Sequence, residues 1–339
     1  AERGFAPRLR GYARVAKAAS AAASESDALD VKGVSPDARV QGILEKYQAL
    51  PAPPAGSLDV AHFTVRVTHA ERLSASTDVM RWTAPSHQCE VVLLPVPESM
   101  PPLRPLNAAV TTPGGLFDIN MRTWDSDWAR DFLAEHGWRE LVPSVAWQFG
   151  EIETSEGLYI QEDGIVMAVM QRLHPPLEGI AFDRMSDIFN STQMVRDVEQ
   201  TLAFLRLLGF ERFIDHEGPL PGDGPRVLQL EQHPVDTAAI HLSIAHPQAT
   251  MSGSIELIDV PHHSLPAIEV AATGGRGLRS LGVPCADVEQ TFAVIQESEW
   301  AGQICQPLAD RQLPGLLSGL CFAVTCPDGG RLDLYQRTS

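Results

Sequence analysis

The sequence predicts an α+β fold made of four tandem βαβββ units, which are paired in two domains. The first observation behind this prediction is a repeat: the letters DVEQT occur at 197–201 and again at 287–291. The second is a shared spacing, because Asp125, Asp197 and Asp287 are each followed thirteen positions later by an aromatic residue. A pattern that recurs along one chain indicates a structural unit that is used several times.

Each of these aspartates is predicted to begin a helix. An aspartate at the start of a helix accepts hydrogen bonds from backbone N–H groups that have no partner inside the helix. Apolar residues then recur at helical spacing, and Gly137 and Gly209 stand where two of the helices should end. Glycine is common at that position because it adopts left-handed backbone angles without strain. The sequence therefore predicts three similar helices.

Strand-like segments surround each predicted helix. One such segment precedes each helix: GLFDINMRT, DIFNSTQMV and RGLRSLGVP. Further segments follow the helices: residues 146–151 and GIVMAVMQR in the second unit, RVLQLEQ, TAAIHLSIA and GSIELIDV in the third, and GQICQPL, GLCFAVTC and RLDLYQR in the fourth. A first unit is traced from the strand ALDVKGV, the helix SPDARVQGILEKYQAL and the strands VAHFTVRVT, DVMRWTA and CEVVLLPV. Alternating apolar patterns bounded by turn residues are typical of strands.

Proline-rich segments separate the predicted units. The one near residue 175, HPPLEG, divides the chain into an N-terminal paired domain at 28–173 and a C-terminal paired domain at 183–339. Residues 1–27 are basic and rich in alanine and serine. We expect a surface helix there, and a targeting segment is the alternative.

Composition restricts the possible partners. The formal net charge of −17 argues against nucleic acid, because phosphate binding needs an excess of Lys and Arg. No apolar run is long enough to cross a membrane. The five cysteines include no CxxC pair, which predicts reduced thiols in a cytoplasmic protein. We therefore expect a small-molecule substrate, no nucleic acid and no membrane, with a homodimer left open.

The segments STQMVRDVEQTLAFLRLLGFERF and CPDGGRLDLYQR resemble the vicinal oxygen chelate superfamily, and the resemblance covers roughly residues 105–338. This superfamily includes glyoxalase I, bleomycin-resistance proteins and extradiol dioxygenases. The resemblance implies that paired units curl around a shared cavity, so that the four units form two cup-shaped half-barrel domains. We call the first strand of each unit its opening strand and the last its closing strand. In members that use a metal, the resemblance implies one metal ligand on the opening strand and one on the closing strand of each unit.

The resemblance assigns these ligand positions to particular residues. The opening-strand positions are Asp118, Asn190 and Ser280, and the closing-strand positions are Ala168, Glu256 and Asp333, with Glu90 in the first unit. Iron, nickel and zinc sites favour imidazole backed by carboxylate, and no histidine occupies these positions. We therefore expect no metal ligands and no cofactor, although oxygen ligands of this kind could hold a divalent metal weakly.

Three functions remain open. The first is a lyase or isomerase in which Glu256 and Asp333 are catalytic, and Asn190, Thr192 and Ser280 bind substrate in the C-terminal cup. The second is a protein that binds a small molecule without chemistry, and the third is an extradiol dioxygenase. Asp118 and Arg122 share one strand face in the N-terminal half and form either a second binding site or a mutually neutralising pair.

Overall fold

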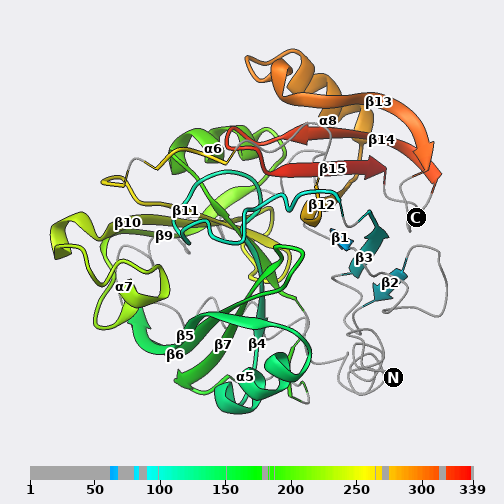
Figure 1. Ribbon diagram of the computed structural model, residues 1–339. Helices are drawn as coiled ribbons and strands as arrows, with labels where there is room; N and C mark the ends of the chain where they lie inside the picture. Colours follow the sequence, from blue (N-terminus) through cyan, green and yellow to red (C-terminus); the bar gives the residue numbers. More distant parts are fainter. Residues whose placement is uncertain are drawn as a thin grey trace.

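Two β-sheets and the helices packed on them form the described part of the protein (Figure 1). The computed structural model describes residues 62–67, 80–83, 90–97, 99–149, 151–177, 182, 184–186, 188–263, 265–268, 275–312 and 318–336. The predicted basic segment at 1–27, the strand ALDVKGV and the helix SPDARVQGILEKYQAL lie outside these residues.

The larger sheet has eight strands in the order β5-β6-β7-β4-β8-β11-β10-β9. Its strands are β4 (Asp118–Arg122), β5 (Arg139–Phe149), β6 (Ile152–Ile160), β7 (Val166–His174), β8 (Asn190–Met194), β9 (Glu211–Pro219), β10 (Ala239–His246) and β11 (Ser254–Asp259). At its centre the opening strands β4 and β8 pair antiparallel, with Asp118 opposite Thr192 and Asn120 opposite Asn190. Each opening strand also pairs in parallel with its own closing strand, β7 or β11.

The smaller sheet has seven strands in the order β13-β14-β15-β12-β1-β3-β2. Its strands are β1 (His62–Val67), β2 (Met80–Thr83), β3 (Glu90–Pro95), β12 (Gly277–Cys285), β13 (Ile304–Gln312), β14 (Ser318–Thr325) and β15 (Arg331–Gln336). Strand β1 pairs antiparallel with β12 and in parallel with β3. In the larger sheet, an opening strand pairs with the other opening strand and with its own closing strand. Strand β1, with the sequence HFTVRV, makes the same two pairings and is therefore the opening strand of the first unit.

The strand order corrects the expected pairing of units. The sequence predicted paired domains at 28–173 and 183–339, whereas the larger sheet joins the second unit to the third and the smaller joins the first to the fourth. An opening strand with an unpaired edge exposes backbone N–H and C=O groups, so each unit needs a partner. The opening strands of the second and third units form hydrogen bonds with each other along these edges. The proline-rich segment near 175 therefore connects strands of one sheet rather than two domains.

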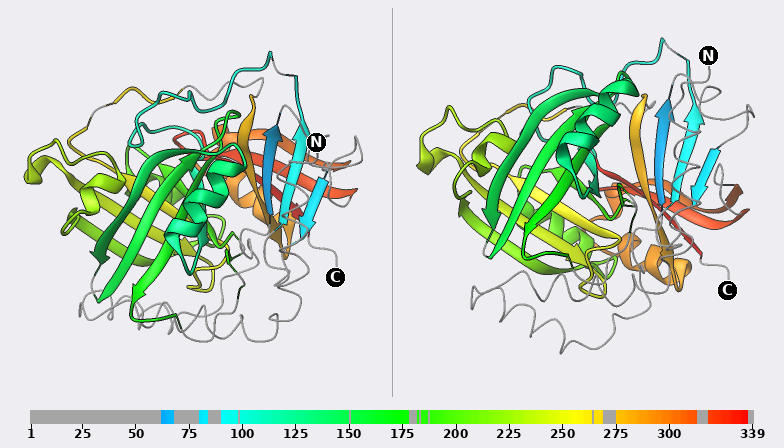
Figure 2. Two further views of the ribbon diagram at one scale, coloured as in Figure 1. Left: turned by 60° about the horizontal axis from the view of Figure 1, so that its bottom comes forward. Right: turned by 90° about the horizontal axis from the view of Figure 1, so that it is seen from below.

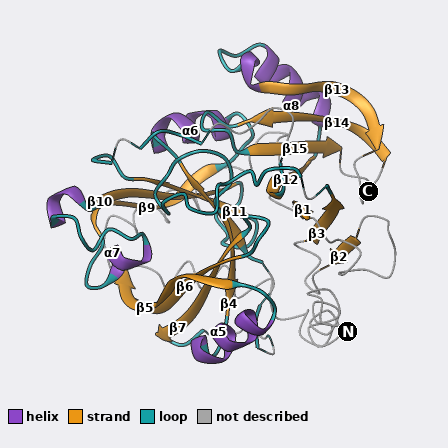
Figure 3. Ribbon diagram, viewed as in Figure 1, coloured by secondary structure: helices purple, strands orange, loops and turns teal. Residues whose placement is uncertain are grey.

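The three predicted helix starts are confirmed. Helices α5 (Ser126–Glu135), α6 (Val198–Arg206) and α8 (Val288–Gln296) begin after Asp125, Asp197 and Asp287. Each aspartate accepts a hydrogen bond from the backbone N–H three residues later, over 2.9–3.0 Å. Helix α5 packs against β5, β6 and β7, α6 against β9, β10 and β11, and α8 against β12, β13, β14 and β15 (Figure 3).

The segment RVLQLEQ was wrongly predicted as a strand. The short helix α7 (Gly224–Val227) begins before it and turns follow, and the strand after α6 is instead β9. Pro221 and Pro225 lack the N–H group that a strand interior would need, so this segment leaves the sheet. Helix α7 packs against β5 and β6, and the short helices η2 (Val235–Thr237) and η3 (Ala301–Gln303) complete the described elements.

Each face of the larger sheet packs against its own hydrophobic cluster. On β4, Ile119 and Met121 point into a cluster that contains the inner residues of α5, α6 and α8 and residues of the smaller sheet. The second cluster lies on the opposite, concave face and contains residues such as Ala168 and Met194. Because side chains alternate along a strand, Asp118 also belongs to the concave face. Figure 2 shows this sheet curling beside the smaller one.

Four cysteines lie in the described residues. Cys285, Cys321 and Cys326 are buried free thiols, and Cys305 is an exposed one. In the described ranges, no helix has the length and apolar character needed to cross a membrane.

Candidate functional site

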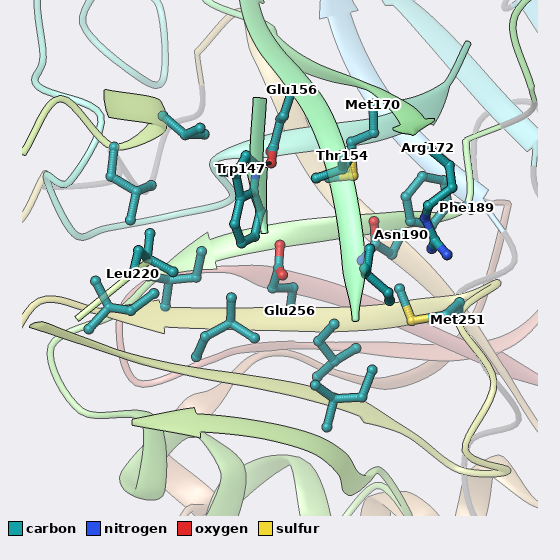
Figure 4. A pocket seen from close by; sticks show the side chains of 18 of the residues that line it. Trp147, Thr154, Glu156, Met170, Arg172, Phe189, Asn190, Leu220, Met251 and Glu256 are labelled. Carbon is teal, nitrogen blue, oxygen red and sulfur yellow. Dashed lines mark hydrogen bonds between the residues drawn. The ribbon is translucent and has the colours of Figure 1, made fainter. Parts of the chain in front are cut away.

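The concave face of the larger sheet encloses a cavity of about 160 Å³. Both units of this sheet contribute side chains to it, and Figure 4 shows most of them. The lining residues are Arg122, Trp147, Ile152, Thr154, Glu156, Met170, Arg172, Phe189, Asn190, Ile214, Leu220, Val227, Leu228, Ile240, Leu242, Ile244, Met251, Glu256 and Ile258. Most are apolar, and the few polar side chains converge from β4, β6, β7, β8 and β11, as is common in small-molecule sites.

A hydrogen-bonded network joins the two units at the base of this cavity. The Thr192 hydroxyl donates to Oε2 of Glu256 over 2.7 Å and accepts from Nδ2 of Asn120 over 3.0 Å. Asp118 Oδ1 accepts from the backbone N–H of Thr192 over 3.1 Å and from Nδ2 of Asn120 over 3.2 Å. Two carboxyl groups from different units are therefore held in one network.

A third carboxyl group, that of Glu156, was not predicted from the sequence. The indole N–H of Trp147 donates to its Oε2 over 3.0 Å. Figure 4 shows the carboxyl groups of Glu156 and Glu256 pointing toward each other beside this indole ring. The available signal was the alternation of β6, which places Glu156 on the same face as the cavity residues Ile152 and Thr154.

Burial and mutual repulsion raise the pKa values of these carboxyl groups. Desolvation, followed by the charge of Glu256, raises the pKa of Asp118 to about 7. Desolvation, followed by the charges of Glu256 and Asp118, raises the pKa of Glu156 to about 8. Desolvation also raises the pKa of Glu256, against the hydrogen bond from Thr192.

The sequence suggested a neutralising pair of Asp118 and Arg122 as one alternative. The positive charge that partly offsets the raised pKa of Asp118 is instead that of Arg104. Arg104 is buried and donates to the carbonyl oxygens of Ala109, Val110 and Thr112 over 2.6–3.1 Å. The guanidinium of Arg122 lies over the ring of Phe189, 4.2 Å from its centroid, where both residues line the cavity.

The sheet pairing divides the predicted site residues into two groups. Asp118, Arg122, Asn190, Thr192 and Glu256 come together on the concave face of the larger sheet, although they were predicted in two different cups. These residues remain candidates for a functional role.

Ser280 and Asp333 lie in the smaller sheet, so the predicted cup that combines Asp333 with Glu256 is wrong. The Ser280 hydroxyl donates to Oδ2 of Asp333 over 2.5 Å, and Arg331 Nη2 donates to Oδ1 over 2.7 Å. Asp333 is buried and already hydrogen-bonded, which is typical of a structural carboxylate.

The larger cup does not fit the metal site that the resemblance implies. The resemblance assigns its four ligand positions in this cup to Asp118, Asn190, Ala168 and Glu256, and the sheet brings their four strands side by side. Alanine has no donor atom, and no histidine lines the cavity. Among the described residues, no three His, Cys, Asp or Glu side chains are placed to hold one metal ion. This donor set lacks the imidazole that iron, nickel and zinc favour.

Comparison with solved structures assigns the fold. Glyoxalase I from Zea mays aligns over 83% of this chain and 92% of its own, with 13% identity and a TM-score of 0.52. A mutant of the same maize enzyme aligns over 83% and 94%, with 12% identity and a TM-score of 0.54. A Bacillus subtilis protein described as a dioxygenase aligns over 84% and 87%, with 10% identity and a TM-score of 0.50.

No family model and no curated protein matches the sequence. At identities this low the likeness concerns the fold and does not transfer an activity. The repeated units, their helix caps and these structural neighbours agree with one another. The chain therefore has the fold of the vicinal oxygen chelate superfamily.

Proposed function

We propose that the protein is a lyase or isomerase that moves protons on a small, largely apolar, oxygenated molecule by means of carboxyl groups. The observation that supports this most is the placement of Glu156 and Glu256 at one apolar cavity, with Asp118 behind them. Carboxyl groups whose pKa is raised toward neutral pH suit general acid–base catalysis. The free cysteines favour the cytoplasm as its compartment.

Glu256 is the proposed base. It lines the cavity, and the hydroxyl of Thr192 fixes the orientation of its carboxyl group. Burial raises its pKa, so its carboxylate binds a proton more strongly than an exposed glutamate does. It is therefore suited to take a proton from a carbon next to a carbonyl or carboxyl group.

Glu156 is the proposed acid. Its pKa of about 8 leaves it mostly protonated at neutral pH, so its O–H can donate to a substrate oxygen on which charge develops. The N–H of Trp147 binds one carboxyl oxygen and leaves the other available. The carboxyl groups of the two glutamates point toward each other in the cavity (Figure 4), so the proposed acid and the proposed base can act on one molecule.

Asn190 is the proposed contact for a substrate hydroxyl group. It lines the cavity, and its Oδ1 is buried without a hydrogen-bond partner within the described residues. A buried polar atom of this kind is normally satisfied in the functional state. A substrate hydroxyl group would supply the missing hydrogen.

Exchange in deuterated water tests this proposal without knowledge of the physiological substrate. A panel of small 2-oxo, 2-hydroxy and 3-hydroxy acids and their neutral analogues is incubated with protein, and proton NMR follows loss of the carbon-bound hydrogen. We expect catalysed exchange for at least one compound, and its loss in Glu256→Gln, which keeps the shape of the side chain. Exchange that persists in Glu256→Gln would refute the assigned base.

A non-catalytic binding protein is the second candidate, and the mostly apolar lining favours it. In that case calorimetry would detect binding of a panel compound while neither the wild type nor any variant exchanges hydrogen. The extradiol dioxygenase alternative needs an iron site, and the donor set at Asp118, Ala168, Asn190 and Glu256 does not favour one.

A further inference from the structure

We propose that the ligand of this cavity is a small carboxylic acid whose carboxylate binds Arg122 and Arg172, with its apolar body lying toward Leu220 and Leu228. This inference rests on the proposed function, because it names the substrate class of the same site. Charge is distributed unevenly along the cavity, with cationic side chains at one end and apolar ones at the other.

The two arginines come from neighbouring strands and lie at the same end of the cavity. Arg122 on β4 is in register with Met170 on β7, and Arg172 is two residues beyond Met170 on the same face. Thr154 on β6 is in register with Arg172. All four residues line the cavity, so two guanidinium groups and one hydroxyl group border this end.

The proposed acid lies one step further along the same strands. Glu156 is in register with Met170, which places it two residues from Thr154 along β6. Two residues of a strand span roughly 7 Å. A carboxylate held by the arginines would therefore place the next carbon atoms of the ligand near the glutamates, where proton transfer is proposed.

Phe189 favours a fixed orientation for one of these arginines. The guanidinium of Arg122 is buried and lies over the ring, 4.2 Å from its centroid. A guanidinium stacked on an aromatic face keeps its N–H donors in its own plane, directed outward from its edge. A carboxylate is the ligand group that matches this planar set of donors.

The opposite end of the cavity suits an apolar body of limited size. Leu220 lies at this end in Figure 4, away from Arg172. Val227, Leu228 and isoleucines of β9 and β10 also line the cavity. A cavity of about 160 Å³ resembles the engineered cavities of about 150 Å³ that hold benzene. The body is therefore about the size of one ring or a short branched chain.

The acidic groups of the site do not exclude an anionic ligand. Asp118 and Glu156 have pKa values of about 7 and 8, so much of this cluster is uncharged at neutral pH. The chain as a whole carries a net charge of −17, which repels anions in general. Local cations inside the cavity are the feature that would overcome this repulsion.

Matched acids and amides test the proposal. Isothermal titration calorimetry at pH 7 compares mandelate with mandelamide, benzoate with benzamide, and 2-hydroxyisocaproate with its amide. We expect at least one acid to bind about tenfold or more tightly than its amide, because a charge-assisted contact is lost in the amide. Arg172→Met should remove this preference, mainly by weakening the acid.

Controls separate this effect from folding and from chemistry. Arg122 is buried, so the half-exposed Arg172 is the first site to change, and Arg122→Met is used where circular dichroism shows native folding. Arg130→Met makes the same charge change on the exposed surface of α5 and should keep the preference. Calorimetry measures binding without turnover, so the acid preference is tested even if the proposed reaction is wrong.

Two results would overturn the proposal. One is that no acid of the panel binds more tightly than its amide. The other is an acid preference that Arg172→Met and folded Arg122→Met both leave intact, or that Arg130→Met removes equally. Loss of exchange without loss of acid preference would instead concern the catalytic glutamates alone.

Discussion

The hydroxyl of Thr192 donates a 2.7 Å hydrogen bond to Oε2 of Glu256, and the two residues stand directly opposite each other on β8 and β11. The same hydroxyl accepts from Asn120 of the neighbouring unit over 3.0 Å. Its one hydrogen is therefore committed to Glu256. This contact links the central strand pair to the proposed base, and it influences both the orientation and the acidity of that group.

Replacing Thr192 by Val should raise the pKa of Glu256. The hydrogen bond from Thr192 favours the ionised carboxylate and opposes desolvation, so its removal favours the protonated form. Carbon-detected NMR of labelled glutamate side chains would follow the titration. Thr192→Ser keeps the hydroxyl group and should titrate like the wild type. An unchanged Glu256 titration in Thr192→Val would contradict the role of this contact.

Stability should fall as pH rises from about 4 to about 8. Glu156 and Asp118 have folded-state pKa values of about 8 and 7, above their ordinary 4.5 and 3.8. The folded state therefore binds more protons than the unfolded state in this window. The resulting stabilisation is fully present below the unfolded pKa values and is lost as pH rises through the folded ones.

Glu156→Gln tests this pH dependence, because it removes one of the titrating groups. Thermal denaturation from pH 5 to 8.5 should show a smaller fall in Tm for this variant than for the wild type. Over this pH range, the wild type should lose about 1 kcal/mol or more of unfolding free energy beyond what the variant loses, since one pKa unit corresponds to about 1.4 kcal/mol. Glu153→Gln changes an exposed residue of the same strand and should retain the full fall.

Local features of the fold could be predicted from the sequence, because their causes lie within a few residues. Asp125, Asp197 and Asp287 cap their own helices, so each start was recognisable in isolation. The opening and closing strands followed from their positions relative to these caps. The same reasoning placed Asn190 and Glu256 on one face of their unit, and both line the cavity.

The pairing of units could not be predicted in this way. The contact of Asp118 with Thr192 joins strands more than seventy residues apart, and all four opening strands offer similar backbone edges. The repeated DVEQT letters reflect helix capping and carry no information about which edges pair. Glu156 was missed because no strand was predicted over 152–160, where the structure has β6, so no face was assigned to this residue.

Replacing Asp197 by Ala should reduce the free energy of unfolding by about 1 kcal/mol. Its carboxylate accepts a 2.9 Å hydrogen bond from the backbone N–H of Gln200, and alanine leaves that group without this partner. Urea denaturation measures the loss. Asn caps helices about as well as Asp, so Asp197→Asn should stay close to the wild type. Equal losses in the two variants would point to a role of the charge instead.

Purified, untagged protein should contain no stoichiometric iron, nickel or zinc. The four ligand positions of the larger cup offer Asp118, Asn190, Ala168 and Glu256, which lack imidazole. Elemental analysis by mass spectrometry tests this, with a sample dialysed against a chelator as the control for loosely held ions. About one such ion per chain would contradict the expectation. It would direct attention to the smaller sheet, where His62 and Glu90 stand in register on β1 and β3.

Glu256→Gln and Asp333→Asn should have opposite consequences, because the two carboxyl groups belong to different sheets. Glu256 lines the cavity, so its replacement should abolish exchange and change stability little. Asp333 binds Ser280 and Arg331 in a buried cluster, and its replacement leaves donors unsatisfied. We expect Asp333→Asn to lose about 1–3 kcal/mol of stability and to keep exchange activity. Urea denaturation and the NMR exchange assay, applied to both variants, measure the two effects. A folded Asp333→Asn protein without activity, beside a fully active Glu256→Gln protein, would place the functional site in the smaller sheet.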